Sequence, residues 1–410
     1  MLKHAKNVKT IQSAQNSKKI SLLRRFLRLI LQNPSIIKPV LKLEYTRNMR
    51  LYWWRRFNTG YAGTPANVGI NLTRRCNLKC KMCMQNRHVT VDKAKLSWYD
   101  SGQELPLSAW VNLINEIAIY RPWVSVTGGE PLLYPDFTKV IQALKEKKLP
   151  IDLTTNGLLL KDIAEFLVEQ RVEMIFVSVD GPEDVHDEIR GLKGAFQRTI
   201  AGIRALVEAR AKQKGYGPVI AVNCTMTKSN LHIIDQMVSL AVSLNVELLQ
   251  FIHPFFNTRA NAEKHNRMFS PKWAKAKGLN LVPPSLPEGE YYESELSEDD
   301  LPIMIDGLEK ARRQAKGRIA LKVLPHLSYD LLHPYYLNMN YPFSQTCKAL
   351  WTKCRVLPDG AVSPCLHVVA GNITEQPLLE LWNGPQMSRL REIIAKRLFP
   401  ACDRCCNKKF

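Results

Sequence analysis

The chain has 410 residues, of which 45% are hydrophobic and 23% are charged. These fractions match those of globular proteins, so they exclude a wholly disordered chain and a polytopic membrane protein. The length indicates one enzyme-sized domain with appendages. Charge is the anomaly, because 58 Lys and Arg against 37 Asp and Glu give a formal net charge of +21.

Most of this excess lies in residues 1–60, where 14 Lys or Arg stand against a single acid, Glu44, and supply +13. Such a segment suits a polyanion or an anionic membrane surface, and a solvated tail is the alternative. Its apolar residues recur at helical spacing opposite arginines, but they are too few and too interrupted to span a bilayer. We therefore expect residues 1–65 to form a basic amphipathic arm that lies on a membrane or packs on the protein itself.

From about residue 66, six β-rich runs alternate with helical stretches. The expected strands are residues 68–72, 124–127, 151–155, 175–179, 220–225 and 248–251. The expected helices begin near residues 108, 136, 161, 196 and 231. This alternation predicts an α/β fold of parallel βαβ units. Six repeats predict a partial (β/α)6 barrel with its chemistry at the carboxyl ends of the strands.

The remaining chain divides into two further segments. Residues 257–340 are rich in Asn and Pro and contain an acidic run, so we expect a connector that covers the barrel mouth or forms a solvated loop, with a helix near 302–316. Residues 341–410 contain six cysteines and predict a small α+β module. In that module Asp359-Gly360 is typical of a hairpin turn, and residues 378–398 have helical periodicity.

Ten cysteines in a long chain without an evident secretory signal indicate a reducing compartment, where clustered thiols signify metal. Cys224 stands alone on an expected strand and suits the core. The other nine form two groups separated by the body of the chain, namely Cys76, Cys80 and Cys83, and Cys347, Cys354, Cys365, Cys402, Cys405 and Cys406.

The first group, Cys76-x3-Cys80-x2-Cys83, directly follows the first expected strand. Three thiolates can hold three irons of a cubane cluster and leave the fourth iron open to another ligand. A zinc knuckle is the alternative, because Cys80, Cys83 and His88 begin such a motif. However, Lys93 stands where its last cysteine would fall, and structural zinc needs four ligands.

Further motifs stand at the ends of the next three strands. They are Gly128-Gly129-Glu130-Pro131, Thr154-Thr155-Asn156-Gly157 and Ser178-Val179-Asp180-Gly181, followed by a segment with His186, Asp187, Arg190, Gly191 and Gly194. With the three cysteines, this set resembles the radical S-adenosylmethionine (SAM) superfamily over residues 66–256. Met82 departs from the family's usual aromatic residue and keeps its apolar character.

The resemblance implies a [4Fe–4S] cluster on Cys76, Cys80 and Cys83 whose open iron binds SAM. An external one-electron reductant of the flavodoxin or ferredoxin type would then allow formation of a 5′-deoxyadenosyl radical that abstracts hydrogen. The glycines would let the backbone approach the cofactor, and the guanidinium of Arg190 would suit its carboxylate. The implied cofactor contacts are Gly128, Gly129, Glu130, Asn156, Ser178, Asp180, Arg190 and Asn223.

The second group resembles the Twitch form of the SPASM module, on Cys347, Cys365, Gly371-Asn372, Leu381-Trp382 and Cys402-x2-Cys405. A full SPASM module needs more cysteines, so the resemblance implies one auxiliary cluster of the 4Fe–4S type. Its ligands would be Cys347, Cys365, Cys402 and Cys405, with a zinc ribbon as the alternative. Cys354 could serve either as a small hydrophobic residue in the core or as a substitute cluster ligand. Cys406 could replace Cys405 as a ligand. Both thiols are also candidate catalytic hydrogen donors.

Together these features predict a radical SAM enzyme that oxidises, epimerises or rearranges an unactivated C–H position. The basic arm and short module favour a small-molecule or carrier-linked substrate, specifically a sugar-, nucleotide- or lipid-linked one, and a peptide maturase is the alternative. A zinc-bearing nucleic-acid-binding protein would leave the strand-end motifs unexplained, so we expect no nucleic-acid partner. We expect a cytoplasmic protein, with residues 1–60 available for peripheral contact at the inner face of the membrane.

Overall fold

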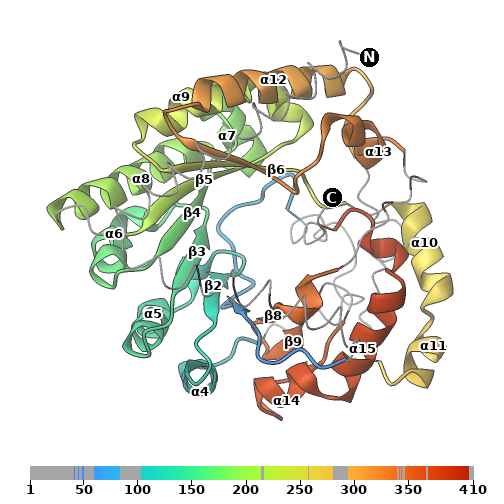
Figure 1. Ribbon diagram of the computed structural model, residues 1–410. Coiled ribbons are helices and arrows are strands. Elements are labelled where there is room, and N and C mark those ends of the chain that lie inside the picture. The colour runs from blue at the N-terminus through green and yellow to red at the C-terminus, as the bar shows by residue number, and fades with distance from the viewer. Residues whose placement is uncertain are drawn as a thin grey trace, which may run out of the picture.

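The computed structural model describes residues 60–83, 103–213, 217–256, 258–279, 294–338, 347–365 and 368–405, and single positions at 41, 45, 49, 341 and 343. Within this part of the chain, one ten-stranded sheet runs in the order β10-β9-β8-β1-β2-β3-β4-β5-β6-β7. Figure 1 shows it as a curved sheet with helices outside it. The strands are β1 (Asn67–Asn71), β2 (Trp123–Thr127), β3 (Ile151–Thr155), β4 (Met174–Ser178), β5 (Val219–Thr225), β6 (Leu248–Ile252), β7 (Ala320–Leu324), β8 (Lys353–Val356), β9 (Ala361–Ser363) and β10 (Gly371–Asn372).

Strands β1 to β6 are the six that the sequence predicts, with ends within one residue, and they pair in parallel as expected. The parallel array is nevertheless wider than predicted. Strand β7 joins β6, and strand β8 joins the other side of β1, both in parallel. The expected connector and the cysteine module therefore each supply a strand to the barrel sheet. In β7 the central Lys322 interrupts the apolar run that would have indicated a strand.

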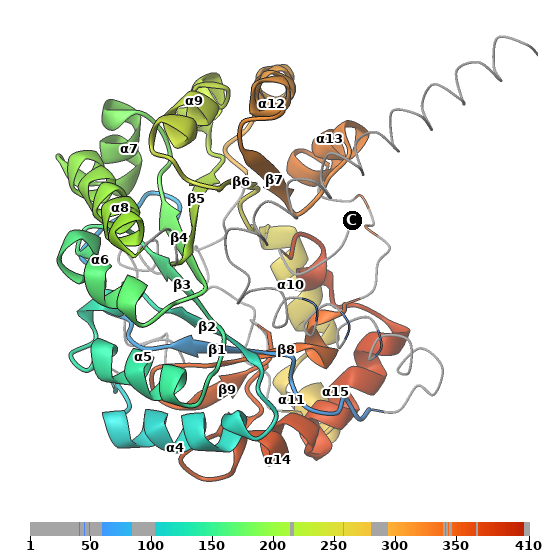
Figure 2. The same ribbon diagram turned by 60° about the vertical axis from the view of Figure 1, so that its left-hand side comes forward.

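Among the described residues, one set of helices covers the outer face of this sheet, and the remaining helices lie on the side of the cysteine module (Figures 1 and 2). The outer helices are α4 (Leu107–Ala118), α5 (Phe137–Glu146), α6 (Leu160–Glu169), α7 (Glu183–Arg190), α8 (Ala195–Lys212), α9 (Gln236–Ser243) and α12 (Asp300–Ala315). The others are α10 (Arg259–Met268), α11 (Pro271–Ala276), α13 (Leu332–Tyr336), α14 (Leu378–Asn383) and α15 (Pro385–Lys396).

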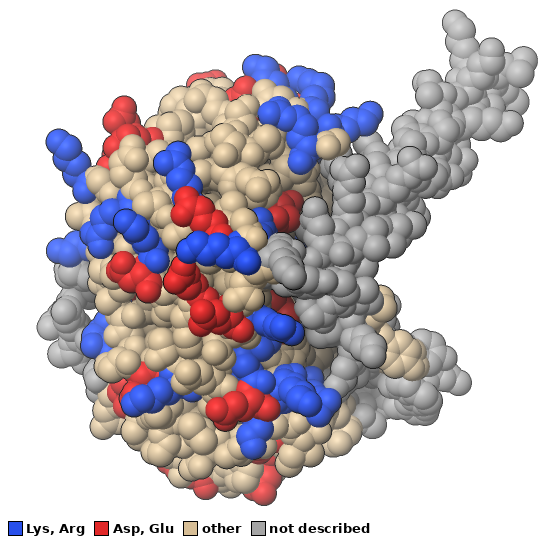
Figure 3. Space-filling model, turned by 90° about the vertical axis from the view of Figure 1, so that its left-hand side faces the viewer, with Lys and Arg blue, Asp and Glu red and all other residues tan. Residues whose placement is uncertain are grey.

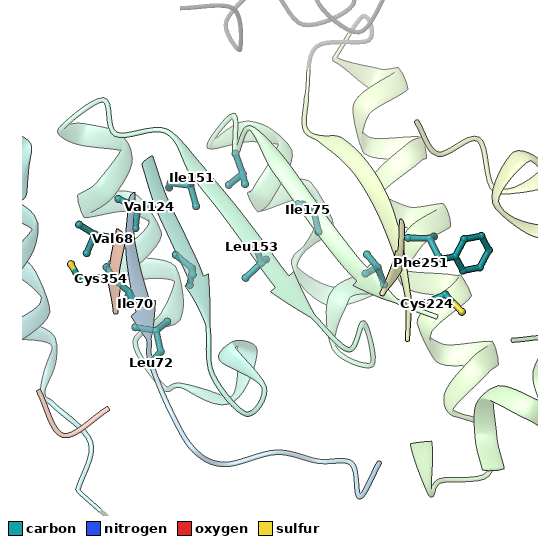
Figure 4. Close-up of a cluster of buried hydrophobic side chains, with 14 of the residues drawn as sticks. Val68, Ile70, Leu72, Val124, Ile151, Leu153, Ile175, Cys224, Phe251 and Cys354 are labelled. Atoms are coloured by element: carbon teal, nitrogen blue, oxygen red, sulfur yellow. The ribbon is translucent and has the colours of Figure 1, made fainter. Parts of the chain in front are cut away.

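Alternation along the strands fixes which side chains face the helices. Val68 and Ile70 on β1 are fully buried in the hydrophobic core, and Cys354 on the neighbouring β8 lies with them (Figure 4). Intervening residues such as Gly69 point to the opposite, inner face of the sheet. The inner face is therefore where the strand-end motifs can meet.

The cysteine module is built onto the barrel rather than beside it. Strands β8 and β9 form an antiparallel hairpin around Asp359-Gly360, as the sequence predicts. The predicted single helix over 378–398 is instead two helices, because Pro385 cannot donate a backbone hydrogen bond and begins α15. The carboxylate of Glu116 on α4 accepts hydrogen bonds from the backbone N–H groups of Leu378 (3.0 Å) and Leu379 (2.9 Å) at the start of α14.

Most of the predicted arm lies outside the described residues, which include only its residues 60–65 and the single positions Leu41, Tyr45 and Met49, all three helical and exposed. In the described ranges, no helix has both the length and the apolar character that a membrane span requires. On the face shown in Figure 3, Lys and Arg are interspersed with Asp and Glu.

Candidate active site

A loop of residues 72–83, here called the cluster loop, follows β1 and carries the first three cysteines. Cys76 is exposed, Cys83 is half-buried and Cys80 is buried. The backbone N–H of Lys81 donates to the carbonyl oxygen of Ile189 at 2.9 Å, which fastens the loop to α7. Three thiols thus lie within eight residues at the carboxyl end of a central strand.

The glycine motif after β2 is docked against this loop by its backbone. The N–H of Gly129 donates to the carbonyl oxygen of Thr73 (2.7 Å), and the N–H of Glu130 donates to that of Arg75 (2.8 Å). A Cβ on Gly129 would lie 2.6 Å from the carbonyl oxygen of Arg74 and closer still to that of Arg75. The absence of a side chain at Gly129 therefore makes room for the cluster loop. From the sequence, we expected this glycine to let the backbone approach the cofactor.

Glu130 joins the ends of β2 and β3. Its fully buried carboxylate accepts hydrogen bonds from the hydroxyl of Thr155 (2.8 Å) and the backbone N–H groups of Asn156 (2.7 Å) and Leu132 (3.2 Å). Burial raises the pKa of Glu130 to about 7, although these donors oppose the shift. These three hydrogen bonds hold the carboxylate against the ends of β2 and β3.

Asn156 connects the end of β3 to the cluster loop. Its Nδ2 donates to Oδ1 of Asn77 at 2.8 Å and lies 3.9 Å from Sγ of Cys76. Its Oδ1 accepts from the N–H of Leu158 at 3.0 Å, which fixes the side-chain orientation. Asn77 was not singled out from the sequence, although its position directly after Cys76 was the available signal.

Asp180 and Arg190 form a buried ion pair below the loop. Nη2 of Arg190 lies 2.6 Å from Oδ2 of Asp180, and Nη1 donates to Sγ of Cys80 at 3.6 Å. Oδ1 of Asp180 also accepts from the N–H of Thr225 at 2.9 Å. Burial raises the pKa of the Cys80 thiol, and the Arg190 cation opposes that rise by favouring the thiolate. These two expected cofactor residues therefore interact with each other and with a cysteine.

The donor set fits an iron–sulfur cluster with a bound polar cofactor. The buried Nε of Arg190 and the buried Oδ1 of Asn71, at the end of β1, have no hydrogen-bond partner within the described part of the chain. The Nε–H of Arg190 can donate a hydrogen bond and Oδ1 of Asn71 can accept one. These two groups would therefore suit a ligand that carries both acceptors and donors. Within the same residues, no three His, Cys, Asp or Glu side chains gather closely enough for a single metal ion. A cubane instead binds each thiolate on a separate iron.

Ser178 and Asn223 lie opposite one another on the neighbouring strands β4 and β5, and both are half-buried. Asn223 Oδ1 accepts a hydrogen bond of 3.2 Å from Nε2 of Gln250 on β6. Together they extend the polar region along the inner face, away from β1 in strand order.

In the module, Cys347, Cys365, Cys402 and Cys405 are all half-buried. Cys354 is buried on β8, where burial raises its pKa to about 12, and this environment fits the apolar interpretation. Cys224 is fully buried on β5, and burial raises its pKa strongly. Cys406 lies outside the described residues.

Arg404, between Cys402 and Cys405, was missed by the sequence analysis. Its buried guanidinium donates to the carbonyl oxygens of Pro334 (2.9 Å), Tyr335 (3.2 Å) and Asn338 (2.8 Å). Arg404 thereby joins the segment of Cys402 and Cys405 to α13 and to Asn338, two residues beyond that helix. A charged residue inside a Cys-x2-Cys pair was the signal that could have identified it.

The barrel, the three-cysteine loop and the strand-end motifs together define a radical SAM protein. Family models agree, since residues 70–234 match the radical SAM superfamily and residues 347–406 match SPASM, an iron–sulfur cluster-binding domain. The chain belongs to the radical SAM superfamily and is a radical SAM enzyme with a C-terminal SPASM domain. It uses a [4Fe–4S] cluster with SAM, and the SPASM domain indicates an auxiliary iron–sulfur cluster. These domains contradict the alternative in which both cysteine groups hold zinc.

Among relatives, the chain is similar to the AdoMet-dependent heme synthase of Methanosarcina barkeri, with 29% identity over 84% of this chain and 89% of that protein. It is 28% identical to the Fe-coproporphyrin III synthase of the same organism, over 83% of this chain and 82% of that protein. Its fold resembles that of Streptococcus suis SuiB bound to precursor peptide SuiA. That match has a TM-score of 0.57 and 17% identity, over 84% of this chain and 70% of the other.

Proposed function

We propose that this enzyme abstracts hydrogen from an unactivated C–H position of a small-molecule or carrier-linked substrate and oxidises the resulting radical. The observation that carries the proposal is the docking of the cluster loop by Gly129, Glu130 and Asn156 at the carboxyl ends of β1 to β3. The cofactor, when bound, supplies a 5′-deoxyadenosyl radical. The Arg190–Asp180 pair holds Cys80 in place, and Asn71 and Arg190 offer polar atoms to the cofactor.

The auxiliary cluster supports oxidation over epimerisation. Removal of a hydrogen atom and then an electron from one carbon is a two-electron oxidation, and a second cluster can accept the electron. Epimerisation would instead need a thiol that returns a hydrogen atom. Cys354 and Cys224 are buried with strongly raised pKa values and suit packing better, and Cys406 is not described.

Two substrate classes are candidates, and a different observation supports each. The sequence-based preference is a sugar-, nucleotide- or lipid-linked molecule, and the similarity to a heme synthase and an Fe-coproporphyrin III synthase adds tetrapyrroles to the small-molecule class. The second candidate is peptide maturation, which the fold shared with peptide-bound SuiB favours. The proposed electron donor is a reductant of the flavodoxin or ferredoxin type. The proposed location is the cytoplasm, with membrane contact through residues 1–60.

The test is anaerobic reconstitution with iron and sulfide, reduction with dithionite in the presence of SAM, and measurement of 5′-deoxyadenosine. We expect product from the wild type and none from a Cys76→Ala, Cys80→Ala, Cys83→Ala variant. We also expect about eight irons per chain on a two-cubane model, and about four after Cys402→Ala with Cys405→Ala. Equal product from wild type and triple variant would refute the radical chemistry.

The arm requires a separate assay. Deletion of residues 1–60 should abolish sedimentation with liposomes that contain anionic lipid, while the iron content stays unchanged. Identical sedimentation of both proteins would rule out membrane contact through this segment.

A further inference from the structure

Arg404 lies in the turn that carries the last two expected cluster ligands, Cys402 and Cys405. The backbone N–H of Cys405 donates to the carbonyl oxygen of Cys402 at 3.2 Å, which closes the turn. Arg404 directly precedes Cys405 and is buried, with 1% of its surface exposed. Burial withdraws a positive charge from water, so the guanidinium must find its partners in the protein or in a bound group.

Packing contacts account for two of the three guanidinium nitrogens of Arg404. Nε and Nη2 donate to carbonyl oxygens in α13 and just beyond it. Nη1 is also buried, but it has no hydrogen-bond partner in the described part of the chain. The ring of Phe343 lies 5.0 Å from Cζ and attracts the cation, but it accepts no conventional hydrogen bond. One buried donor is therefore left for a group that the described residues do not provide.

The charge of Arg404 is paired less closely than that of Arg190. Arg190 forms an ion pair with Asp180 at 2.6 Å, whereas no carboxylate forms one with Arg404 among the residues that the structure describes. The neighbouring Asp403 adds an attractive charge without forming an ion pair. The carbonyl oxygens that Arg404 contacts are neutral, and a buried charge is costly unless an opposite charge compensates it. This cation therefore suits a negatively charged group beside the cysteines.

The unpartnered nitrogen is not a general feature of buried arginines in this protein. In the described ranges, the arginines with a buried nitrogen that lacks a hydrogen-bond partner are Arg190 and Arg404. Arg190 contacts Cys80 in the cluster loop, and Arg404 directly precedes Cys405. Arg391 on α15 is equally buried, but each of its guanidinium nitrogens donates to an oxygen atom. The incomplete guanidiniums thus accompany the two groups of expected cluster ligands.

An electrostatic role follows from the chemistry of the cluster. A cubane held by four thiolates carries negative charge, which increases when the cluster accepts an electron, so a fixed cation nearby stabilises the reduced state. We propose that Arg404 compensates the charge of the auxiliary cluster and raises its reduction potential. This inference rests on the proposed ligands Cys402 and Cys405 and deepens the proposed function, in which this cluster accepts an electron.

The experiment measures the reduction potential of the auxiliary cluster in reconstituted full-length protein by a redox titration followed with electron paramagnetic resonance. Addition of SAM should alter the signal of the first cluster, whose open iron it binds, and so distinguishes the two clusters. Arg404→Gln removes the charge and keeps a hydrogen-bond donor, whereas Arg404→Lys keeps the charge. Lys396→Gln is the control, because it removes an exposed cation at the end of α15.

We compare the variants at the solution potential at which half of the wild-type auxiliary cluster is reduced. Arg404→Gln should lower the ratio of reduced to oxidised cluster at least about tenfold, which is about 59 mV for one electron. Coulomb's law with an effective dielectric constant of about 20 gives an effect of about this size for a charge about 10 Å away. Arg404→Lys should stay within about threefold of wild type. Lys396→Gln should leave the ratio unchanged, because water and salt screen an exposed charge.

An unchanged ratio in Arg404→Gln would overturn the proposal. An equal fall in Arg404→Gln and Arg404→Lys would also overturn it, because hydrogen-bond geometry and not charge would then set the potential. If Arg404→Gln loses the auxiliary irons, the iron content of Arg404→Lys decides. About eight irons in Arg404→Lys would support a required charge, and about four in both variants would show that Arg404 only holds the turn.

Failure of the proposed function gives a different result. About four irons in the wild type would remove the auxiliary cluster itself, and the role of Arg404 with it. Formation of 5′-deoxyadenosine depends on the first cluster and is measured separately. If the wild type holds about eight irons and forms this product while the Arg404 variants keep the wild-type ratio, the electrostatic role fails and the proposed function stands.

Discussion

Arg190 carries a buried positive charge whose only carboxylate partner within the described residues is Asp180. Replacement by Met would leave that carboxylate buried and uncompensated, because its other recorded partner is the backbone N–H of Thr225. We expect Arg190→Met to lower the free energy of unfolding by about 3–5 kcal/mol in urea titrations. The double variant Arg190→Met, Asp180→Asn should recover most of this loss. A cost below about 1 kcal/mol for the single variant would contradict a closely coupled pair.

Asp152 predicts a pH dependence of stability away from the cysteines. It accepts hydrogen bonds from the hydroxyl of Ser125 (2.8 Å) and the indole N–H of Trp123, and burial raises its pKa to about 6 from 3.8. Between these values the unfolded chain releases a proton that the folded protein retains, so stability falls as pH rises and levels off above about 6. The loss amounts to up to about 3 kcal/mol.

The Asp152→Asn variant isolates this contribution, because an amide oxygen can still accept a hydrogen bond and does not titrate. Urea unfolding at several pH values should show a shallower fall between about pH 4 and 6 than in wild type. Glu169→Gln, at an exposed carboxylate on α6, should keep the wild-type slope. Parallel curves for wild type and Asp152→Asn would contradict the pKa assignment.

At the scale of elements, the turn after β2 depends on the small size of Gly129. A methyl group there would meet the carbonyl oxygens of Arg74 and Arg75. Gly129→Ala should therefore displace the cluster loop, and reconstituted protein should retain at most about four irons, those of the auxiliary cluster. Gly69→Ala is the matched control, because its Cβ would make an ordinary 3.5 Å contact and iron content should stay at the wild-type value. Full iron content in Gly129→Ala would show that the loop tolerates the displacement.

The sequence predicted β1 to β6 well because Val, Ile and Leu recur on the face that packs against the helices. It failed for β7, where Lys322 on the inner face interrupts the apolar run. It also merged α14 and α15, since periodicity continues across Pro385 while the backbone hydrogen bonding does not. The local sequence pattern therefore sufficed where one face of a strand is uniformly apolar. It failed where a charged residue interrupts the apolar run, or where a break in backbone hydrogen bonding decides the element.

The sequence predicted which residues belong to the candidate site, but it did not predict which of them contact one another. The motif spacing identified Cys76, Cys80 and Cys83 as ligand candidates, because all three lie on one short loop. Asp180 and Arg190 were each assigned to the cofactor, whereas tertiary structure pairs them with one another. Contacts such as that of Arg404 with the carbonyl of Pro334 join segments 70 residues apart, and no local pattern encodes such a contact.

For the whole molecule, the shared sheet predicts that barrel and SPASM domain unfold together. Strand β8 covers the edge of β1, and the guanidinium of buried Arg391 on α15 donates to the carbonyl oxygens of Gly60 (2.9 Å), Leu350 (2.8 Å) and Trp382 (2.7 Å). We expect one urea transition for the full chain, with circular dichroism and hydrogen exchange in α6 and α14 giving the same midpoint.

Arg391→Met tests this coupling, because it leaves three buried carbonyl groups without that donor. We expect it to lower the free energy of unfolding by about 3 kcal/mol or more while α6 and α14 still lose protection together. Arg389→Met, at an exposed arginine of the same helix, should change stability by less than about 0.5 kcal/mol. If protection in α14 were lost at a lower urea concentration than in α6, the SPASM domain would be an independent unit, and β8 would not be part of the barrel's cooperative core.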